Sequence, residues 1–383
     1  MTPRSVREYM AALGPSYRQA SRQQKGRLMG EAERLTGYHR KSLLRLLRRP
    51  VEGASRRRGR PRHYGPAVAP ALHRLWEASD RLCSKRLVPF LPTLIAALER
   101  HDALRLSAPV RAQLLTMSPA TADRLLAPYR AGLKRRPYTQ RSALSSLQAQ
   151  IPVRTFGEWQ DAAPGAVQAD LVAHCGPTTA GFYLSSLLMV DVVTSWTECR
   201  AVWGQGKRYV AGAVGHLQKR LPLPLRELHV DNGGEFLNHV LYPYCQEEGI
   251  HFTRGRPYHK NDQAWAEQKN GLVVRRLVGY DRYNSKAAHQ LLNQIYDQLH
   301  FYLNFFQPMR KLLAKQRHGA RVTKTYDQAQ TPYQRVLAAG VLDPTACERL
   351  EDQFLNLNPV ALRTEIYRLL GQLWKLADGP RLQ

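Results

Sequence analysis

The chain has 383 residues, 57 Lys and Arg against 30 Asp and Glu, and a formal net charge of +27. Its length provides for two or three domains, and its 43% hydrophobic content excludes wholesale disorder. No segment approaches the roughly 18 to 20 apolar residues of a membrane span, and the first residues lack the apolar core of a signal peptide. We therefore expect a cytoplasmic protein with no membrane partner. Five scattered cysteines, none in a Cys-x-x-Cys pair, indicate neither a disulfide framework nor a zinc site, and reduced thiols are expected. The charge indicates a polyanionic partner, with nucleic acid as the first candidate.

The positive charge is concentrated near the amino terminus. Residues 1–64 hold 17 basic and 4 acidic residues, and residues 65–150 hold 13 and 5. Residues 151–280 hold 13 and 12. This change indicates a modular chain in which a basic binding portion precedes a domain of another kind. The expected domains are 1–64, 65–150, 151–310 and 311–383.

Helical patterns dominate the first segment. Arg22 to Leu35 places apolar side chains on one face, a Thr-Gly pair interrupts the pattern, and Tyr38 to Arg49 resumes it. Two helices around such a turn are typical of a helix-turn-helix, with an ordinary basic helical hairpin as the alternative. The second helix would present Arg40, Lys41 and Arg45 to a DNA major groove.

An arginine-rich run follows at residues 56–62, and its Gly and Pro keep it out of a helix. Its Arg-Gly-Arg-Pro core resembles the AT-hook, an arm that lies in the narrow minor groove of A·T-rich DNA. A solvated linker is the alternative. The arginines expected to contact DNA are Arg58, Arg60 and Arg62.

A second helical pattern lies in residues 65–150. Pro109 to Leu115 and Ala120 to Leu126 are expected to be helical, with Ser118 as the N-cap of the latter. A second helix-turn-helix and plain helical packing both fit this pattern. Residues 138–157, rich in Gln, Ser and Thr, are expected to form a linker.

From about residue 166 the pattern changes to strands. An antiparallel meander of three strands is followed by a helix, a strand, a helix, a strand, a loop and a helix, which is the element order of a ribonuclease-H-like α/β domain. The expected strands are 166–172, 182–193, 197–203, 225–230 and 250–253, and the expected helices are 207–220, 242–248 and 263–278.

Three carboxylates mark this domain. Asp170 lies in the first strand, Asp231 ends the fourth, and Glu267 lies in the last helix, with 35 residues between Asp231 and Glu267. Carboxylate oxygens are the ligands that Mg²⁺ and Mn²⁺ prefer. Two such ions, about 3.5 to 4 Å apart, activate a water or a 3′-hydroxyl and stabilise the leaving oxygen of a phosphoryl transfer. We therefore expect these three acids to be the catalytic residues and the ligands of two Mg²⁺ or Mn²⁺ ions.

Three motifs, at residues 167–170, 229–236 and 257–270, resemble the catalytic core of retroviral integrases and of insertion-sequence transposases with an Asp, Asp, 35-residue, Glu triad. The resemblance covers about residues 155–310. It implies a retroviral-integrase-like fold, two Mg²⁺ ions, and DNA 3′-end cleavage followed by strand transfer. It also implies a bacterial protein associated with the nucleoid. An inactive core that has kept this fold is the alternative.

DNA contacts are expected around Glu267. Two loop residues, and an Asn three residues after Glu267, match family positions near the DNA, and basic residues on the helix are candidates for phosphate contact. A solvated helix face is the alternative for the basic residues. The loop departs from relatives at residues 260–262, where they often carry Asn-Pro or small residues. The expected contacts are Tyr258, Lys260, Gln263, Lys269, Asn270, Arg275 and Arg276.

One further acid, Asp191, ends the second strand. Related transposases often carry an Asp here that does not belong to the triad. We therefore expect Asp191 to support the site without binding metal, with direct ligation as the alternative.

The carboxy-terminal part begins with a long amphipathic helix at residues 286–306. Residues 310–324 contain six basic residues and no acidic one, which predicts a strap that contacts phosphates. The last 60 residues are expected to be helical, with no strand pattern of the kind that forms the β-barrel at the end of many integrases. Their expected role is packing or contact between protomers.

These features predict a multidomain insertion-sequence transposase. Its fold would combine N-terminal all-α helix-turn-helix modules, a central ribonuclease-H-like domain and a helical C-terminal region. The N-terminal part would bind terminal inverted repeats of double-stranded DNA, and the core would cleave the 3′ ends and join them to target DNA. Because two ends must meet, a dimer or tetramer on DNA is expected. A DNA-binding regulator with an inactive core and a structure-selective nuclease of the same fold are the alternatives.

Overall fold

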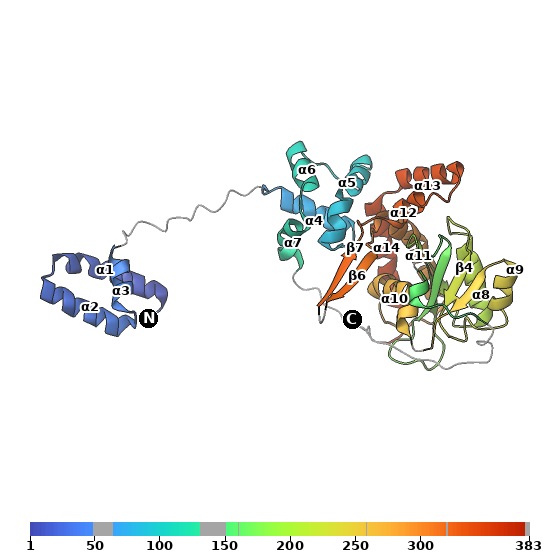
Figure 1. The fold of residues 1–383 in the computed structure, drawn as a ribbon, viewed down its shortest axis with the longest axis horizontal. Coiled ribbons are helices and arrows are strands. Elements are labelled where there is room, and N and C mark those ends of the chain that lie inside the picture. Colours follow the sequence, from blue (N-terminus) through green and yellow to red (C-terminus); the bar gives the residue numbers. More distant parts are fainter. Residues whose placement is uncertain (49–63, 131–150, 160, 258, 319–320, 380–383) are drawn as a thin grey trace. The chain divides into compact units, whose positions relative to one another are not determined.

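A computed structural model describes residues 1–48, 64–130, 151–159, 161–257, 259–318 and 321–379 (Figure 1). The chain divides into two compact units, residues 1–63 and 64–383. In the part of the chain that the structure describes, no helix is long and apolar enough to cross a membrane.

The first unit is a three-helix bundle of α1 (Pro3–Gln19), α2 (Arg22–Thr36) and α3 (Arg40–Arg48). A capping box of Ser21 and Gln24 starts α2, and Gly37 ends it with a φ of 71°, a conformation that favours glycine. Apolar side chains from all three helices form the small core: Val6, Met10, Met29, Ala32 and Leu43. The predicted helix, turn and helix are thus present, and α1 precedes them.

The second unit is built around a mixed five-stranded sheet. Its strands are β1 (Ala166–Ala173), β2 (Ser185–Asp191), β3 (Thr197–Val202), β4 (Glu227–Val230) and β5 (His251–Arg254), in the order β3-β2-β1-β4-β5. β1, β2 and β3 pair antiparallel, whereas β4 pairs parallel with β1 and β5. The predicted meander and the two later strands are therefore present in the predicted order.

Helices cover both faces of this sheet. Alternating strand residues such as Val167, Ala169 and Leu187 share one core with α8 (Lys207–Gln218) and α9 (Leu241–Glu247). The other face, including Leu188 and Val190, belongs to a larger core. That core includes the predicted long helix, α11 (Lys286–Phe306).

The larger core continues into helices at both ends of the unit. It includes α4 (Val68–Ala78), α5 (Ser84–Arg100), α6 (Ala108–Leu115) and α7 (Pro119–Leu126), together with α12 (Pro332–Ala338) and α14 (Pro359–Leu373), and α13 (Pro344–Asn356) packs against it. Tyr302 on α11 donates to the Ala78 carbonyl at 2.8 Å, which links α11 to the end of α4. The helical C-terminal region is confirmed, and α6 and α7 match the predicted pair, but the sequence pattern did not indicate α4 and α5. One core includes residues on both sides of the predicted domain boundaries at residues 150 and 310. These boundaries stay predictions.

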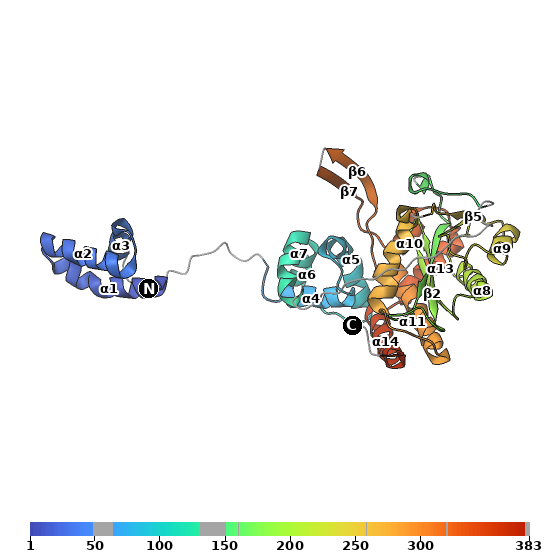
Figure 2. The same ribbon diagram turned by 90° about the horizontal axis from the view of Figure 1, so that it is seen from below.

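The predicted basic strap contains two strands that the sequence pattern did not indicate. β6 (Leu312–His318) pairs antiparallel with β7 (Arg321–Tyr326), and the hairpin projects from the rest of its unit (Figure 2). Most of its described side chains are exposed. The C-terminal region is thus not purely helical.

Candidate active site

The sheet brings Asp170 and Asp231 to the same edge. β1 and β4 are parallel neighbours in which Gln168 pairs with His229, so each aspartate lies two residues further along. Burial raises the pKa of Asp170 to about 7, and the carboxylates of Asp231 and Glu267 contribute to this rise. Asp170 is therefore close enough to both Asp231 and Glu267 for their charges to repel its own.

Gln168 ties the helix of Glu267 to the strand of Asp170. Its buried side chain donates from Nε2 to the Asp262 carbonyl at 2.8 Å. Its Oε1 accepts from the backbone N–H groups of Trp265 and Ala266, at 3.1 and 3.2 Å, in the first turn of α10 (Ala264–Lys269). One amide thus satisfies two donors that lack partners within the helix and fixes α10 against β1.

An ion pair closes the loop before α10. Asp262 is buried, and its carboxylate accepts from the Arg256 backbone N–H and guanidinium, with Nε at 2.9 Å from Oδ2. The 3₁₀ turn η4 (Lys260–Gln263) follows. Gln263 is also buried, and neither its amide nitrogen nor its amide oxygen has a partner among the described residues. Because such groups are costly to leave unpaired, Gln263 offers two unused hydrogen-bonding atoms in this loop.

Asn270 contacts Asp170 directly. Its Nδ2 donates to Asp170 Oδ2, and the Leu171 backbone N–H donates to Asp170 Oδ1 at 2.8 Å. At Asn270 the α-helix gives way to the π-helical segment η5 (Asn270–Arg275), a geometry often found at functional sites. The Asn three residues after Glu267 therefore orients one oxygen of Asp170.

Asp231 lies in the turn after β4 and is partly buried. Its Oδ1 accepts from the Gly233 backbone N–H at 3.0 Å. Burial raises the pKa of Asp231. Burial also raises the pKa of Glu235, and the Asp231 carboxylate raises it further. Glu235, for which the sequence favours a local capping or hydrogen-bonding role, thus lies near Asp231.

The donor chemistry of this edge suits a divalent cation. Asp170, Asp231 and Glu267 provide carboxylate oxygens, the ligands of Mg²⁺ and Mn²⁺, and a cation among them would offset their repulsion. Within the described ranges, however, no group of three or more acidic, His or Cys side chains is arranged to hold a metal ion. The three carboxylates are therefore near one another without forming a closed coordination cage.

Asp191 uses both of its oxygens inside the fold. Oδ2 accepts from the Gly165 backbone N–H at 2.7 Å, and Oδ1 accepts from the backbone N–H and hydroxyl of Thr194. Burial raises the pKa of Asp191, whereas these hydrogen bonds lower it by a smaller amount. The contacts favour the expected supporting role over metal ligation.

The basic residues after Glu267 have different surroundings. Lys269 is buried, and burial lowers its pKa to about 7. Arg275 is partly buried against the Tyr280 ring, 4.9 Å from its centroid. Arg276 is exposed and pairs with Asp80 at 3.0 Å. Lys269 and Arg275 thus do not lie on a solvated helix face, and DNA contact by the three residues stays a prediction.

Other expected DNA contacts lie outside the described residues or in the first unit. Arg40, Lys41 and Arg45 are exposed on α3, and Arg40 is 3.8 Å from Glu33. The Arg58, Arg60 and Arg62 arm, Tyr258 and the side chain of Lys260 are not described.

Sequence reasoning gave no role to Gln168, Asp262 or Arg86, which donates from Nε to the Pro308 carbonyl. Gln168 had a detectable signal: it lies two residues before Asp170 in a strand, so the two side chains face the same side of the sheet. Nothing in the local sequence indicated the pairing of Arg256 with Asp262 or the position of Arg86.

Comparisons with known proteins give one close sequence relative. No protein-family model matches the chain. One similar solved structure is the catalytic core domain of BIV integrase, with 20% identity and a TM-score of 0.30, covering 46% of this chain and 97% of that one. Another is the HTLV-2 integrase catalytic core domain in complex with magnesium, with 16% identity and a TM-score of 0.29, covering 38% of this chain and 91% of that one. The uncharacterized protein y4rM of Sinorhizobium fredii (strain NBRC 101917 / NGR234) is 44% identical over 329 residues, covering 86% of this chain and 94% of the relative. The chain therefore belongs to the same protein family as y4rM.

Proposed function

We propose that this protein is an insertion-sequence transposase, a polynucleotidyl transferase that cleaves the 3′ ends of its element and joins them to target DNA. The observation that carries the proposal is the proximity of Asp170 to Asp231 and Glu267, whose carboxylates add to burial in raising the pKa of Asp170. The order and pairing of the strands support a ribonuclease-H-like core.

The chemistry is assigned to the three carboxylates as ligands of Mg²⁺ or Mn²⁺. When bound, two such ions supply an activated water or 3′-hydroxyl and stabilise the leaving oxygen. The chain's own residues hold the geometry: Asn270 orients Asp170, and Gln168 fixes the helix of Glu267. Asp231 is positioned by the Gly233 N–H.

DNA recognition is assigned to the basic first unit. Residues 1–64 carry 17 basic and 4 acidic side chains, and exposed basic residues on α3 are available for a major groove. The arginine run at residues 56–62 would add minor-groove contacts. Because two element ends must be joined together, we assign the active form to a dimer or tetramer on DNA.

The test uses the full chain and DNA duplexes that carry the sequences flanking its coding region. Asp231→Asn should abolish Mg²⁺-dependent end cleavage and joining while leaving duplex affinity unchanged, because the change removes a charge from the site and not from the DNA-binding unit. Glu247→Gln, at an exposed acid on α9, is the matched control and should cleave normally. Joining by Asp231→Asn at the wild-type rate would contradict the proposal. Wild-type protein that binds these duplexes and never cleaves them would instead favour the regulator.

A further inference from the structure

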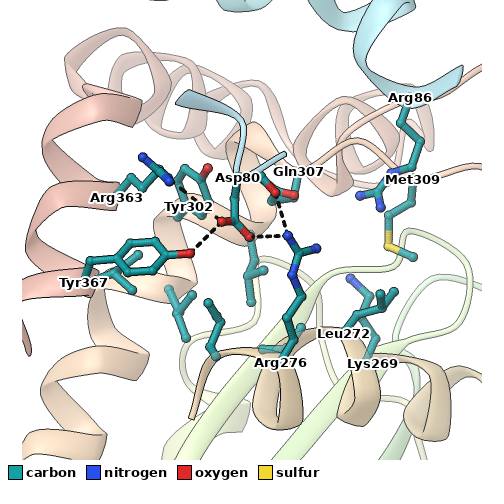
Figure 3. A pocket seen from close by; sticks show the side chains of 15 residues that line it. Asp80, Arg86, Lys269, Leu272, Arg276, Tyr302, Gln307, Met309, Arg363 and Tyr367 are labelled. Atoms are coloured by element: carbon teal, nitrogen blue, oxygen red, sulfur yellow. Dashed lines mark hydrogen bonds and ion pairs between the residues drawn. The ribbon is translucent and has the colours of Figure 1, made fainter. Parts of the chain in front are cut away.

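A cavity lies beside the helix that carries Glu267, within the second unit (Figure 3). It measures about 40 Å³, whereas one ordered water needs only about 10 to 15 Å³. Its walls come from the end of α4, from α5, from α10 and η5, from α11 and from α14. The cavity therefore joins the helices of residues 64–126 to the catalytic region.

The cavity is not a part of the carboxylate site. Lys269 lines it, and Lys269 lies two residues beyond Glu267 on α10. Residues two apart on an α-helix, at 100° per residue, point to nearly opposite sides. The cavity and the three acids thus lie on different sides of the same helix.

Positive charge dominates the lining. Four cations, Arg86, Lys269, Arg276 and Arg363, line the cavity with a single acid, Asp80. Asp80 is already engaged, because its carboxylate pairs with Arg276 at 3.0 Å and accepts from the Tyr367 hydroxyl at 2.7 Å (Figure 3). Arg363 pairs with Glu77 at 3.1 Å. Two of the four cations therefore have carboxylate partners.

The other two cations have none among the described residues. Lys269 is 4% exposed, and its ammonium group makes no hydrogen bond or ion pair with the described part of the chain. Arg86 donates from Nε to the Pro308 carbonyl, a neutral group. Burial lowers the pKa of Arg86, and the nearby Arg276 lowers it further. A buried ammonium without hydrogen bonds is costly, so this arrangement calls for an anion.

Residues outside the described ranges offer little to neutralise these cations. They include the basic segment 131–150, which contains no acidic residue, and Glu52 is the only acidic side chain among all of them. The counter-charge for Lys269 and Arg86 must therefore come chiefly from outside the chain.

We propose that this cavity binds a phosphate-type oxyanion, held by Lys269 and Arg86. The chemistry is shared by a DNA phosphodiester, which rests on the proposed function, and by free inorganic phosphate. Because Arg86 lies on α5 and Lys269 on α10, the bound oxyanion bridges the helices of residues 64–126 to the helix of Glu267. Occupancy of the site would thus stabilise the position of the catalytic helix.

The first experiment measures the melting temperature of the full chain with and without inorganic phosphate, at constant ionic strength and without divalent metal. Wild-type protein should melt about 2 to 4 °C higher in phosphate than in chloride. Lys269→Met and Arg86→Gln should each lose this difference. Lys85→Met, at an exposed lysine beside Arg86 on α5, should keep it. In chloride, Lys269→Met should melt no lower than wild type, since the change removes an unpaired buried charge.

A second experiment separates the two sources of phosphate. The logarithm of duplex affinity falls linearly with the logarithm of salt concentration, and each lost phosphate contact reduces that slope by about 1. A reduced slope in Lys269→Met and in Arg86→Gln assigns the cavity to a DNA phosphodiester. An unchanged slope, with the phosphate effect on melting lost, assigns it to free phosphate.

The proposal is overturned if phosphate does not stabilise wild-type protein and the salt slope of both variants equals that of wild type. Neither measurement needs metal or cleavage. A chain that binds phosphate here and never cuts DNA would therefore refute the proposed function and leave this site standing.

Discussion

The two sides of α10 present opposite electrostatic problems. On one side, burial and the nearby carboxylates of Asp231 and Glu267 raise the pKa of Asp170. On the other side, Lys269 lies buried near Arg86, and burial together with the Arg86 charge lowers the pKa of Lys269. A single short helix thus separates a cluster of acids from a cluster of bases.

Elsewhere the fold balances its buried charges with its own groups. Asp191 has three hydrogen-bond donors, and Lys311 donates to the carbonyls of Val192 and Val193. The contrast teaches that burial alone does not define a binding site. The two sides of α10 differ because like charges gather on each of them, acids on one side and bases on the other, as expected of sites for a cation and for an anion.

The largest expected effect comes from breaking the contact between α10, the helix of Glu267, and β1, the strand of Asp170. Gln168→Leu removes the acceptor for two N–H groups of α10, so Glu267 loses its fixed position relative to Asp170. We expect DNA cleavage to fall by about 10- to 100-fold, the range for residues that orient metal ligands. The metal concentration for half-maximal cleavage should rise, which a merely structural change would not cause.

Gln205→Leu, at an exposed glutamine, is the control and should cleave as wild type does. Circular dichroism should show that Gln168→Leu remains folded. If that variant kept the wild-type metal dependence with reduced stability alone, Gln168 would be a packing residue and the coupling of α10 to β1 would not matter for the site.

The next largest effect concerns the acid that the fold neutralises by itself. Asp191→Ala leaves the Gly165 and Thr194 N–H groups without an acceptor, so it should reduce the free energy of unfolding by about 3 kcal/mol. Urea unfolding measures this loss. In protein that is still folded, the metal concentration for half-maximal cleavage should stay unchanged. A shift comparable to that of Gln168→Leu would place Asp191 among the metal ligands.

The sequence predicted the sheet well because its strands carry local signals. β1, β2 and β3 have apolar runs bounded by turns, and α11 has a continuous amphipathic pattern with the observed bounds. The hairpin β6–β7 escaped prediction because its exposed, basic strands lack an apolar face. The change from α-helix to π-helix at Asn270, within the predicted helix 263–278, was not predicted either. It is accompanied by a contact with Asp170, which is distant in the sequence.

The triad could be predicted from residue type and spacing, since three acids at fixed intervals leave a mark in the sequence. Their supporting residues leave no such mark. Gln168 meets α10 across about 100 residues of chain, and Arg86 reaches the cavity from an even more distant segment. Lys269 was expected to contact DNA or to lie on a solvated helix face, and both require an exposed side chain. It is buried beside a cavity that residues from the turn after α4 and from α5, α11 and α14 also line.

The smallest effect separates two lysines whose pKa values are both lowered by burial. Lys311 has a pKa of about 8 and donates to two carbonyls, whereas Lys269 has no such partner. Lys311→Met should cost about 1 kcal/mol at pH 7, because it removes both hydrogen bonds. Between pH 8 and about 10.4, the unfolded chain binds the Lys311 proton and the folded chain does not, so this group makes wild-type stability rise with pH. Lys311→Met should reduce the slope of stability against pH by an amount that corresponds to at most one bound proton. Urea unfolding at several pH values measures this slope. An equal cost for Lys269→Met in chloride at pH 7 would show that Lys269 has a partner within the chain, and the contrast between the two lysines would fail.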